Sequence, residues 1–512
     1  MQTNFKYGVG DLFKNNLSNL KISFSKISNF LNKELSAKKA FLLLFILYSL
    51  ALLSILRENV SYRDDIGRTA YGFSGWLDFS RYTTEYLSKL IHAGSYISDI
   101  SPIPQIIAII ELSLASIFLL KCITGKKSYN LWQIVATIPL ALNPYFLECL
   151  SFKFDSPYMA LSILVAVVPV LFIKHFYFFI TATVISTVII CTSYQASIGI
   201  LPMVTVFSLL TMYINGEALK NLFKTAFYFA IAFLAGAIIF KTLILQPTVR
   251  DYVSIDIAPF DILPNLFVKN MAIYYSDLFS KSGFIESSAI CKKTIIITTV
   301  VMLIVCVFNS KNNKLLTLLL AALSLTLGAI LTYGFYACLE KPLFIPRALY
   351  GIGVLLACIF TIAVSYKEFF IAKICSVILG WYLIVTASSY GNALVAQKNW
   401  EKFRAEEVVI DLASIDEGRM EGRKFKVEGN CGLSPSLSYL TIDRPIFKRL
   451  IPQTLGQEFW FWNEPQLSYA YGISELTYDN EITDNGTPLI VRETRFHTIK
   501  VFEDKLIIKL KQ

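Results

Sequence analysis

Long apolar stretches separated by short polar turns dominate the first 394 residues of the chain. Stretches of about 20 apolar residues are typical of helices that span a bilayer. Hydropathy predicts about eleven such helices. They lie at residues 40–55, 102–120, 130–149, 158–173, 177–192, 198–213, 225–245, 294–308, 315–335, 348–366 and 374–393. The pattern therefore predicts a polytopic α-helical membrane protein.

Composition agrees with a membrane protein. Hydrophobic residues make up 55% of the chain and charged residues only 16%, against about 25% charged residues in ordinary soluble domains. The net charge of +10 is compatible with nucleic-acid binding, but the sequence has no basic stripe with interleaved aromatic residues. Lysines beside membrane spans explain the charge more simply, so we expect membrane lipids and no nucleic acid as partners.

Lysine and arginine predict the orientation of the chain. The basic segments all fall on one side of an eleven-span arrangement, and that side should be cytoplasmic. They are the N-terminus and the turns at 121–127, 174–175, 220–224, 311–314 and 367–373. The opposite, outer side then holds five segments, which we call the outer loops, and everything after residue 394. The outer loops are residues 57–101, 151–157, 193–197, 246–293 and 337–347. We expect an amphipathic helix in the first of them, from Trp76 to Leu90, and another in the fourth, from Phe267 to Leu278.

The N-terminal segment, residues 1–39, is basic and has apolar residues on one helical face from Phe13 to Leu31. This pattern predicts a helix on the anionic cytoplasmic leaflet. A coiled-coil or packing helix is the alternative.

Residues 395–512 differ from the segment at 40–394, because charges of both signs become dense and turn residues appear. Short β-type runs predict a mixed α/β outer domain, although Glu406–Ser414 is also compatible with the start of a helix. The runs lie at 408–411, 424–427, 489–492 and 506–509. Asp484-Asn-Gly486 predicts a hairpin turn.

The first outer loop carries the most prominent charged cluster. Asp64 and Asp65 lie between Arg63 and Arg68, close to the first apolar stretch. Charged groups tight against a membrane span mark a functional site by default. A solvated loop with ordinary surface ion pairs is the alternative.

Other outer loops add polar residues from distant parts of the chain. A carboxylate among them can act as a general base on a hydroxyl, and an arginine or lysine can hold a phosphate. Together they suit transfer of a group from a lipid-linked phosphate. These residues are Lys153, Asp155, Tyr194, Gln195, Glu340, Lys341 and Arg347. Taken singly, the charged ones are also explained as surface pairs, and Tyr194-Gln195 as a means to satisfy backbone groups at a helix break.

The sequence offers no metal or cofactor site. His92, His175 and His497 are isolated, and the nine cysteines have no C-x-x-C spacing. We therefore expect no metal and no cofactor. The aromatic run Phe459–Trp462 is compatible with stacking on a sugar, but such a run is more often the core of a small domain.

Several short motifs, in their order along residues 40–394, resemble those of a known family. They are the Asp64-Asp65 loop after the first span, the run from Asn143 to Ser156, the Tyr194-Gln-Ala196 break, and Pro346-Arg-Ala-Leu-Tyr-Gly351 at the start of a late span. Together they resemble the bacterial serotype-converting O-antigen glucosyltransferases, the Gtr type within the GT-C superfold.

The resemblance implies a GT-C-like fold in the bacterial inner membrane and an inverting transfer at the periplasmic face. The donor would be a glucosyl group on undecaprenyl phosphate, and the acceptor the O-antigen repeat of lipopolysaccharide. Asp64 or Asp65 matches the expected base, and Asp155 the second acidic position.

Arg347 matches a basic position of the family that suits the donor phosphate. By their charge and their place in the outer loops, Arg68 and Lys153 are further candidates for binding the donor phosphate. On the same grounds, we expect four other outer-loop residues to contact substrate: Tyr194, Gln195, Glu340 and Lys341.

Two other readings stay open. One is a flippase or transporter of lipid-linked sugar, which should show internal repeats and polar residues at mid-membrane depth; we find neither in the sequence. The other is a different envelope transferase, such as an O-antigen polymerase, which would share the loops and differ in its substrate.

Overall fold

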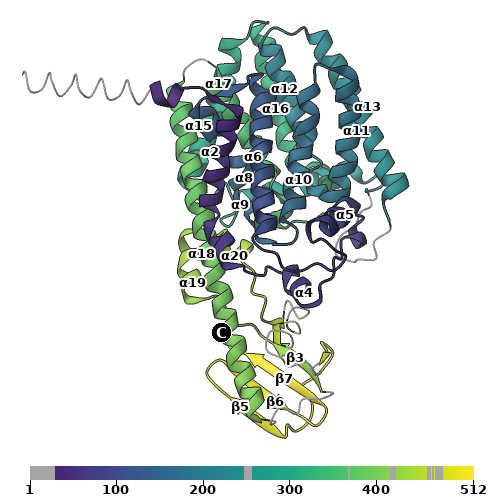
Figure 1. Cartoon of the computed structure of the whole chain (residues 1–512), viewed down its shortest axis with the longest axis vertical. Coiled ribbons are helices and arrows are strands. Elements are labelled where there is room, and N and C mark those ends of the chain that lie inside the picture. The colour runs from purple at the N-terminus through teal and green to yellow at the C-terminus, as the bar shows by residue number, and fades with distance from the viewer. Residues whose placement is uncertain are drawn as a thin grey trace, which may run out of the picture.

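The computed structural model describes residues 29–246, 257–366, 369–415, 423–457, 463, 466–467 and 477–512. Most of these residues form a bundle of helices, and a small β-sheet lies beyond one end of the bundle (Figure 1). The predicted N-terminal surface helix at 13–31 lies outside the described residues except for its last three residues. The aromatic run 459–462 lies wholly outside them.

The apolar stretches of the sequence form the bundle helices. These helices are α2 (Ala37–Ala51), α3 (Leu53–Glu58), α6 (Ile103–Thr124), α7 (Leu131–Ala136), α8 (Ile138–Leu142), α9 (Pro144–Ser151), α10 (Ser156–Val167) with η2 (Val168–Phe172), α11 (Phe176–Ser193), α12 (Ile200–Ile214), α13 (Leu219–Ile239) with η4 (Phe240–Ile244), α15 (Ala289–Asn309), α16 (Lys314–Leu331), α17 (Gly351–Ser365) and α18 (Phe370–Ile415).

Every predicted span is helical, but not every one is long enough to cross a bilayer by itself. Within the described part of the chain, seven helices are long and apolar enough, or eight if a bent pair counts as one span. Two further apolar helices, 156–172 and 351–365, are shorter, and α2 has only 15 residues. The structure therefore supports a polytopic membrane protein, and the number eleven stays a prediction.

The third predicted span, 130–149, is not a single straight helix. The chain bends by 60° between α8 and α9. Proline disfavours helical backbone in the residue before it, and Asn143, before Pro144, is extended with ψ 144°. The Asn143 side chain accepts a hydrogen bond from the Phe146 N–H at 3.1 Å and so caps α9. The bend turns α9 toward the outer loops.

The basic turns do gather at one end of the bundle. Lys126 pairs with Glu34 at 3.2 Å, and β2 (Ser128–Tyr129) pairs with β1 (Leu35–Ser36). Asn312 donates to the carbonyls of Tyr213 and Glu217. Turns that are far apart in the sequence therefore share the end of the bundle opposite the outer loops.

The outer loops form short helices that cover the other end of the bundle. They are α4 (Asp64–Tyr71), η1 (Leu77–Phe79), α5 (Tyr82–Ile91), η3 (Gln195–Ser197), α14 (Leu263–Leu278), η5 (Gly334–Cys338) and η6 (Pro346–Ala348). Helix α14 confirms the helix predicted from Phe267 to Leu278. The helix predicted from Trp76 to Leu90 is only partly right, because the chain forms η1 and then a separate helix, α5. Met271, Tyr274 and Leu278 of α14 are buried, whereas Tyr86 and Leu90 of α5 are exposed.

A single helix connects the bundle to the C-terminal sheet. Helix α18 has 46 residues, about 69 Å at 1.5 Å per residue, or roughly twice the thickness of a bilayer core. The change of composition at residue 395 therefore falls inside a helix. The run Val408–Asp411 is helical, so the strand prediction for it was wrong and the helical alternative for Glu406–Ser414 is confirmed.

The C-terminal sheet has five strands in the order β4-β3-β7-β6-β5. Their bounds are β3 (Lys424–Glu428), β4 (Thr477–Tyr478), β5 (Ile490–Glu493), β6 (His497–Val501) and β7 (Lys505–Leu510). Strand β3 is parallel to both β4 and β7. Strands β3, β5 and β7 coincide with the runs predicted at 424–427, 489–492 and 506–509, so these three strand predictions are confirmed. The hairpin predicted at Asp484–Gly486 is wrong, because this segment joins β4 and β5, the two opposite edges of the sheet.

Two short helices, α19 (Pro435–Asp443) and α20 (Phe447–Leu450), pack on the bundle and not on the sheet. Leu437, Phe447 and Leu450 belong to the core of the bundle. Arg449 forms a bidentate ion pair with Asp277 of α14, at 2.5 and 2.7 Å. The C-terminal part is therefore fixed to the outer-loop end of the bundle.

We predict that a reporter fused after Gln512 is active in the periplasm and inactive in the cytoplasm. The basic turns lie at one end of the bundle and the C-terminal sheet at the other, and lysine-rich turns are retained in the cytoplasm. Paired alkaline phosphatase and green fluorescent protein fusions measure this. Fluorescence without phosphatase activity would reverse the assigned orientation.

Candidate active site

Asp65 holds the first two outer loops together. Its carboxylate is fully buried and accepts hydrogen bonds from the backbone N–H groups of Tyr62 and Lys153, both at 3.0 Å, and of Phe154 at 3.5 Å. Burial raises the pKa of Asp65 to about 7; the charge of Asp155 adds to this, while Arg68 and the N–H donors oppose it. Because both carboxylate oxygens accept hydrogen bonds from backbone N–H groups, Asp65 has a structural role.

Arg68 and Asp155 form a second buried link between the same two loops. The Arg68 guanidinium pairs with one carboxylate oxygen of Asp155, and Trp76 Nε1 donates to the other at 2.6 Å. Arg68 also lies 4.7 Å from the centre of the Trp76 ring. Both charged groups are thus occupied, and neither is free to hold a phosphate or to act as a base.

Lys153 is likewise engaged. Its ammonium is buried and donates to Asp99 at 2.6 Å and to Asn59 at 3.2 Å. The Asp99 pKa is held below its usual range, since these hydrogen bonds outweigh partial burial. The position does not favour the donor-phosphate role expected for Lys153.

Glu148, which the bend at Asn143 brings to this end of the bundle, holds two arginines. Its fully buried carboxylate accepts from the Arg347 backbone N–H at 2.8 Å and from Arg347 Nη1 at 3.1 Å. Arg63 Nε lies 3.7 Å from the same carboxylate. Both arginine side chains stay 21% exposed. One buried negative charge thus orients two positive charges that reach the surface of the site.

Arg63 has an unusual backbone conformation. Its φ is +47° and ψ is −109°, a region that costs about 1–3 kcal/mol for a residue other than glycine. It directly precedes α4, whose first residues are Asp64 and Asp65. The strained turn thus presents Arg63 toward Glu148 while it places Asp65 in the interior.

Asp64 differs from the other carboxylates of the site. It is partly exposed, and none of the described residues forms a hydrogen bond or an ion pair with its carboxylate. Its charge nevertheless acts on Arg68 and Arg347. Asp64 is therefore the partly exposed carboxylate of this site that no described residue engages.

Tyr194 and Gln195 lie at the same site, at the helix break predicted from the sequence. The Tyr194 hydroxyl donates to the Arg347 carbonyl at 3.0 Å. Arg81 lies 4.9 Å from the centre of the Tyr194 ring and donates to Gln195 Oε1 at 3.4 Å. Glu340 and Lys341 are exposed, and no contact found among the described residues joins either of them to this cluster.

The family of the chain follows from its similarity to known proteins. The Glucosyl transferase GtrII family matches residues 53–358, a segment that contains every residue of the site described above. The chain belongs to the GtrII glucosyl transferase family. The GtrII match ends before α18 and the C-terminal sheet.

One further relative supports this result. An uncharacterized 55.3 kDa protein in the gtrB 5′ region of Salmonella phage P22 is 26% identical over 465 residues, which cover 87% of this chain and 93% of that protein. No solved structure matches the chain.

Sequence analysis missed three residues of this GtrII site. Glu148 lies in the family-like run from Asn143 to Ser156, but the sequence suggests no role for it. Arg63 stands out only as a neighbour of Asp64, and no pattern points to Arg81. A charged residue in an otherwise apolar segment was the available signal for Glu148. Nothing in the sequence tells that it pairs with Arg347, 199 residues later.

Metal ligands do not gather in this part of the protein. Within the described ranges, no group of three or more His, Cys, Asp and Glu side chains is arranged to hold an ion. The expectation of a reaction without metal stays a prediction.

We predict that Asp65 makes the stability of this GtrII protein depend on pH. Its folded-state pKa of about 7 exceeds the unfolded value of about 4, so the folded state binds the proton more tightly. The stability that the neutral carboxyl provides is full below about pH 4 and falls as pH rises to about 7. The melting temperature of the wild type relative to Asp65→Asn should therefore decrease between pH 5 and 8.

Asp261→Asn is the matched control for this measurement, because Asp261 is exposed in another outer loop. Its melting temperature should follow that of the wild type at each pH. A difference between wild type and Asp65→Asn that is constant over this range would contradict the assignment.

Proposed function

We propose that the protein transfers a glucosyl group from undecaprenyl phosphate to the O-antigen repeat, at the periplasmic face and with inversion of the anomeric centre. Membership of the GtrII family supports glucosyl transfer. The observation that carries the mechanism is the unengaged Asp64 carboxylate beside two partly exposed arginines that Glu148 orients.

The proposed step balances as a single displacement. Asp64 takes the proton of an acceptor hydroxyl, whose oxygen forms a bond to the anomeric carbon of the glucosyl group. The bond between that carbon and the phosphate oxygen breaks, and the electron pair leaves with the lipid phosphate. Attack from the face opposite the phosphate inverts the anomeric centre. No redox partner or covalent enzyme intermediate is needed.

Arg63 and Arg347 are the proposed phosphate ligands. An arginine offers a planar pair of N–H donors that matches two phosphate oxygens. Once Asp64 has taken the proton of the acceptor, the two arginines carry one positive charge more than Glu148 neutralises, and this charge stabilises the leaving phosphate. In this proposal Arg63 takes the role expected of Arg68 and Lys153, because the side chains of Arg68 and Lys153 are buried whereas Arg63 and Arg347 are each 21% exposed.

Asp65 and Asp155 become positioning residues in this proposal. Each binds two segments of chain and neither is free to meet a substrate. Tyr194 and Gln195 complete the wall of the site through Arg81 and the Arg347 carbonyl. A transporter of lipid-linked sugar is the weaker candidate, since the family match favours transfer.

We predict that Asp64→Asn lowers the rate of glucosyl transfer by about 10²–10⁴-fold, the usual contribution of a general base. The melting temperature should change only slightly, because the amide loses no hydrogen bond and only the charge of Asp64 near Arg68, Arg347 and the start of α4 is removed. Asp65→Asn should have the opposite profile, with a lower melting temperature and a milder loss of rate, since its amide N–H₂ would face backbone donors.

Turnover and thermal unfolding of the purified variants measure this, with Asp261→Asn as the control. Near-normal turnover of Asp64→Asn would show that Asp64 is not the base.

We predict that Arg347→Ala raises the KM for the lipid donor strongly and that Arg347→Lys recovers only part of the loss. A lysine keeps the charge but not the two-pronged geometry. Arg63→Lys should act in the same direction, whereas Lys281→Ala, which changes an exposed outer-loop cation, should match the wild type. If Arg347→Lys, which preserves the partner of Glu148, leaves the donor KM unchanged, Arg347 does not bind the phosphate.

A further inference from the structure

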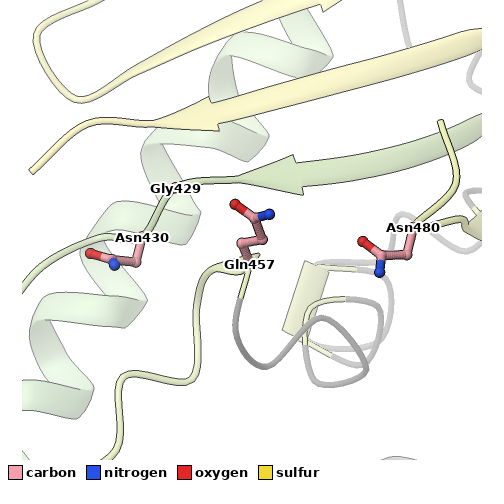
Figure 2. A pocket seen from close by; sticks show the side chains of 4 residues that line it. All are labelled: Gly429, Asn430, Gln457 and Asn480. Carbon is pink, nitrogen blue, oxygen red and sulfur yellow. The ribbon is translucent and has the colours of Figure 1, made fainter. Parts of the chain in front are cut away.

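A polar pocket opens on the C-terminal sheet, away from the Asp64 site. It has a volume of about 380 Å³, and the described residues that line it are Gly429, Asn430, Gln457 and Asn480. Figure 2 shows the side-chain amides of Gln457 and Asn480 beside the end of β3, whereas the amide of Asn430 points away from both. The volume is in the range of small-molecule sites, about 300–1,000 Å³.

The topology of the sheet creates the pocket. Asn430 comes just after β3 and Asn480 just after β4, and these neighbouring strands are parallel. Parallel strands end at the same edge of a sheet, where α/β folds commonly bind ligands. The Gln457 backbone N–H donates to the Gly429 carbonyl at 2.8 Å and brings Gln457 to the same edge.

The pocket wall is fixed in place. Gly429 has a φ of +69°, and a Cβ there would lie 2.5 Å from the Leu510 carbonyl oxygen. The next residues are held by α18, because Trp400 Nε1 and Arg404 Nη1 both donate to the Cys431 carbonyl, at 2.9 and 2.8 Å. Arg404 of α18 is itself buried and also donates to the carbonyls of Phe496 and Lys511, beside strands β6 and β7.

The amides of the pocket have hydrogen-bonding capacity to spare. Asn430 Oδ1 accepts from the Gly432 N–H at 3.1 Å and from Gln512 Nε2 at 2.7 Å, which leaves its N–H₂ group available. Neither Gln457 nor Asn480 has a side-chain hydrogen bond to any part of the chain that the structure describes. A carboxamide both donates and accepts, as a sugar hydroxyl does.

The part of the lining that the structure describes is polar and neutral. None of its four residues is charged, whereas a phosphate site usually contains a lysine or arginine. A neutral ligand with many hydroxyl groups fits best.

We infer that this pocket binds a saccharide unit of the acceptor glycan, which the C-terminal sheet presents to the Asp64 site. The inference rests on the proposed function. The sheet lies beyond the outer-loop end of the bundle (Figure 1), and the Tyr62 hydroxyl, next to the site, donates to the Leu450 carbonyl at 2.6 Å. An acceptor of several sugar units offers one unit to the pocket and another to the Asp64 site, whereas a donor carries a single glucosyl group. A second contact on the same chain raises the effective concentration of the acceptor.

The test uses the full-length protein in detergent and the O-polysaccharide of the strain that carries it. Saturation-transfer NMR should detect binding to the wild type and to Asp64→Asn. The double variant Gln457→Ala/Asn480→Ala should lose this signal and raise the KM for the acceptor roughly 10-fold, as expected for two lost hydrogen bonds. Its donor KM and kcat should stay unchanged. Asn485→Ala, an exposed amide of the same domain outside the pocket, is the matched control.

Equal polysaccharide binding by the double variant and Asn485→Ala would overturn the inference. Binding of methyl glucoside without binding of polysaccharide would also overturn it, since the pocket would then hold a single sugar. Polysaccharide binding that depends on Gln457 and Asn480, in a protein that transfers no glucose, would support the pocket and contradict the proposed function.

Discussion

Buried carboxylates that each bind two distant segments of chain determine the arrangement of the outer loops. Asp65 joins the start of α4 to the backbone at Lys153 and Phe154, and Asp155 joins Arg68 to Trp76. Glu148 holds Arg63 and Arg347. A buried charge is tolerated only when it is paired and hydrogen-bonded. Each carboxylate therefore specifies its partners, and the loops have little freedom to adopt another arrangement.

This constraint separates the two members of the Asp64-Asp65 pair. Consecutive residues at the start of α4 point in different directions, so one carboxylate enters the interior while its neighbour stays at the surface. The interior carboxylate, that of Asp65, accepts backbone hydrogen bonds with both of its oxygens. The surface one is left without a partner among the described residues, next to cations that other carboxylates have already oriented. Reactivity at Asp64 thus depends on the structural roles of Asp65, Asp155 and Glu148.

The same division applies to the cations. Arg68 and Lys153 neutralise buried carboxylates, and their positive charge is balanced within the protein. Arg63 and Arg347 share a single carboxylate, and their side chains reach the surface. A phosphate binds where positive charge is both in excess and accessible, which favours the second pair. Helix α18 extends this organisation beyond the bundle, since Arg404 fixes the strands that carry the second, uncharged pocket.

The sequence by itself determined the class of the protein, the helical stretches, the amphipathic helix of the fourth outer loop, the break at Tyr194 and three of the strands. Each of these depends on local hydrophobic periodicity or on the conformational limits of single residues, and both can be read from a short segment of sequence. It also placed Asp64, Asp65, Asp155 and Arg347 in loops that share one face. Only the tertiary structure decided which of these charges are paired, because the partners of Glu148 and Asp155 are separated by 199 and 87 residues. The bend at Asn143, the helical state of Val408–Asp411 and the separation of β4 from β5 were also beyond the sequence, since packing against distant elements selects among conformations that are locally similar in free energy.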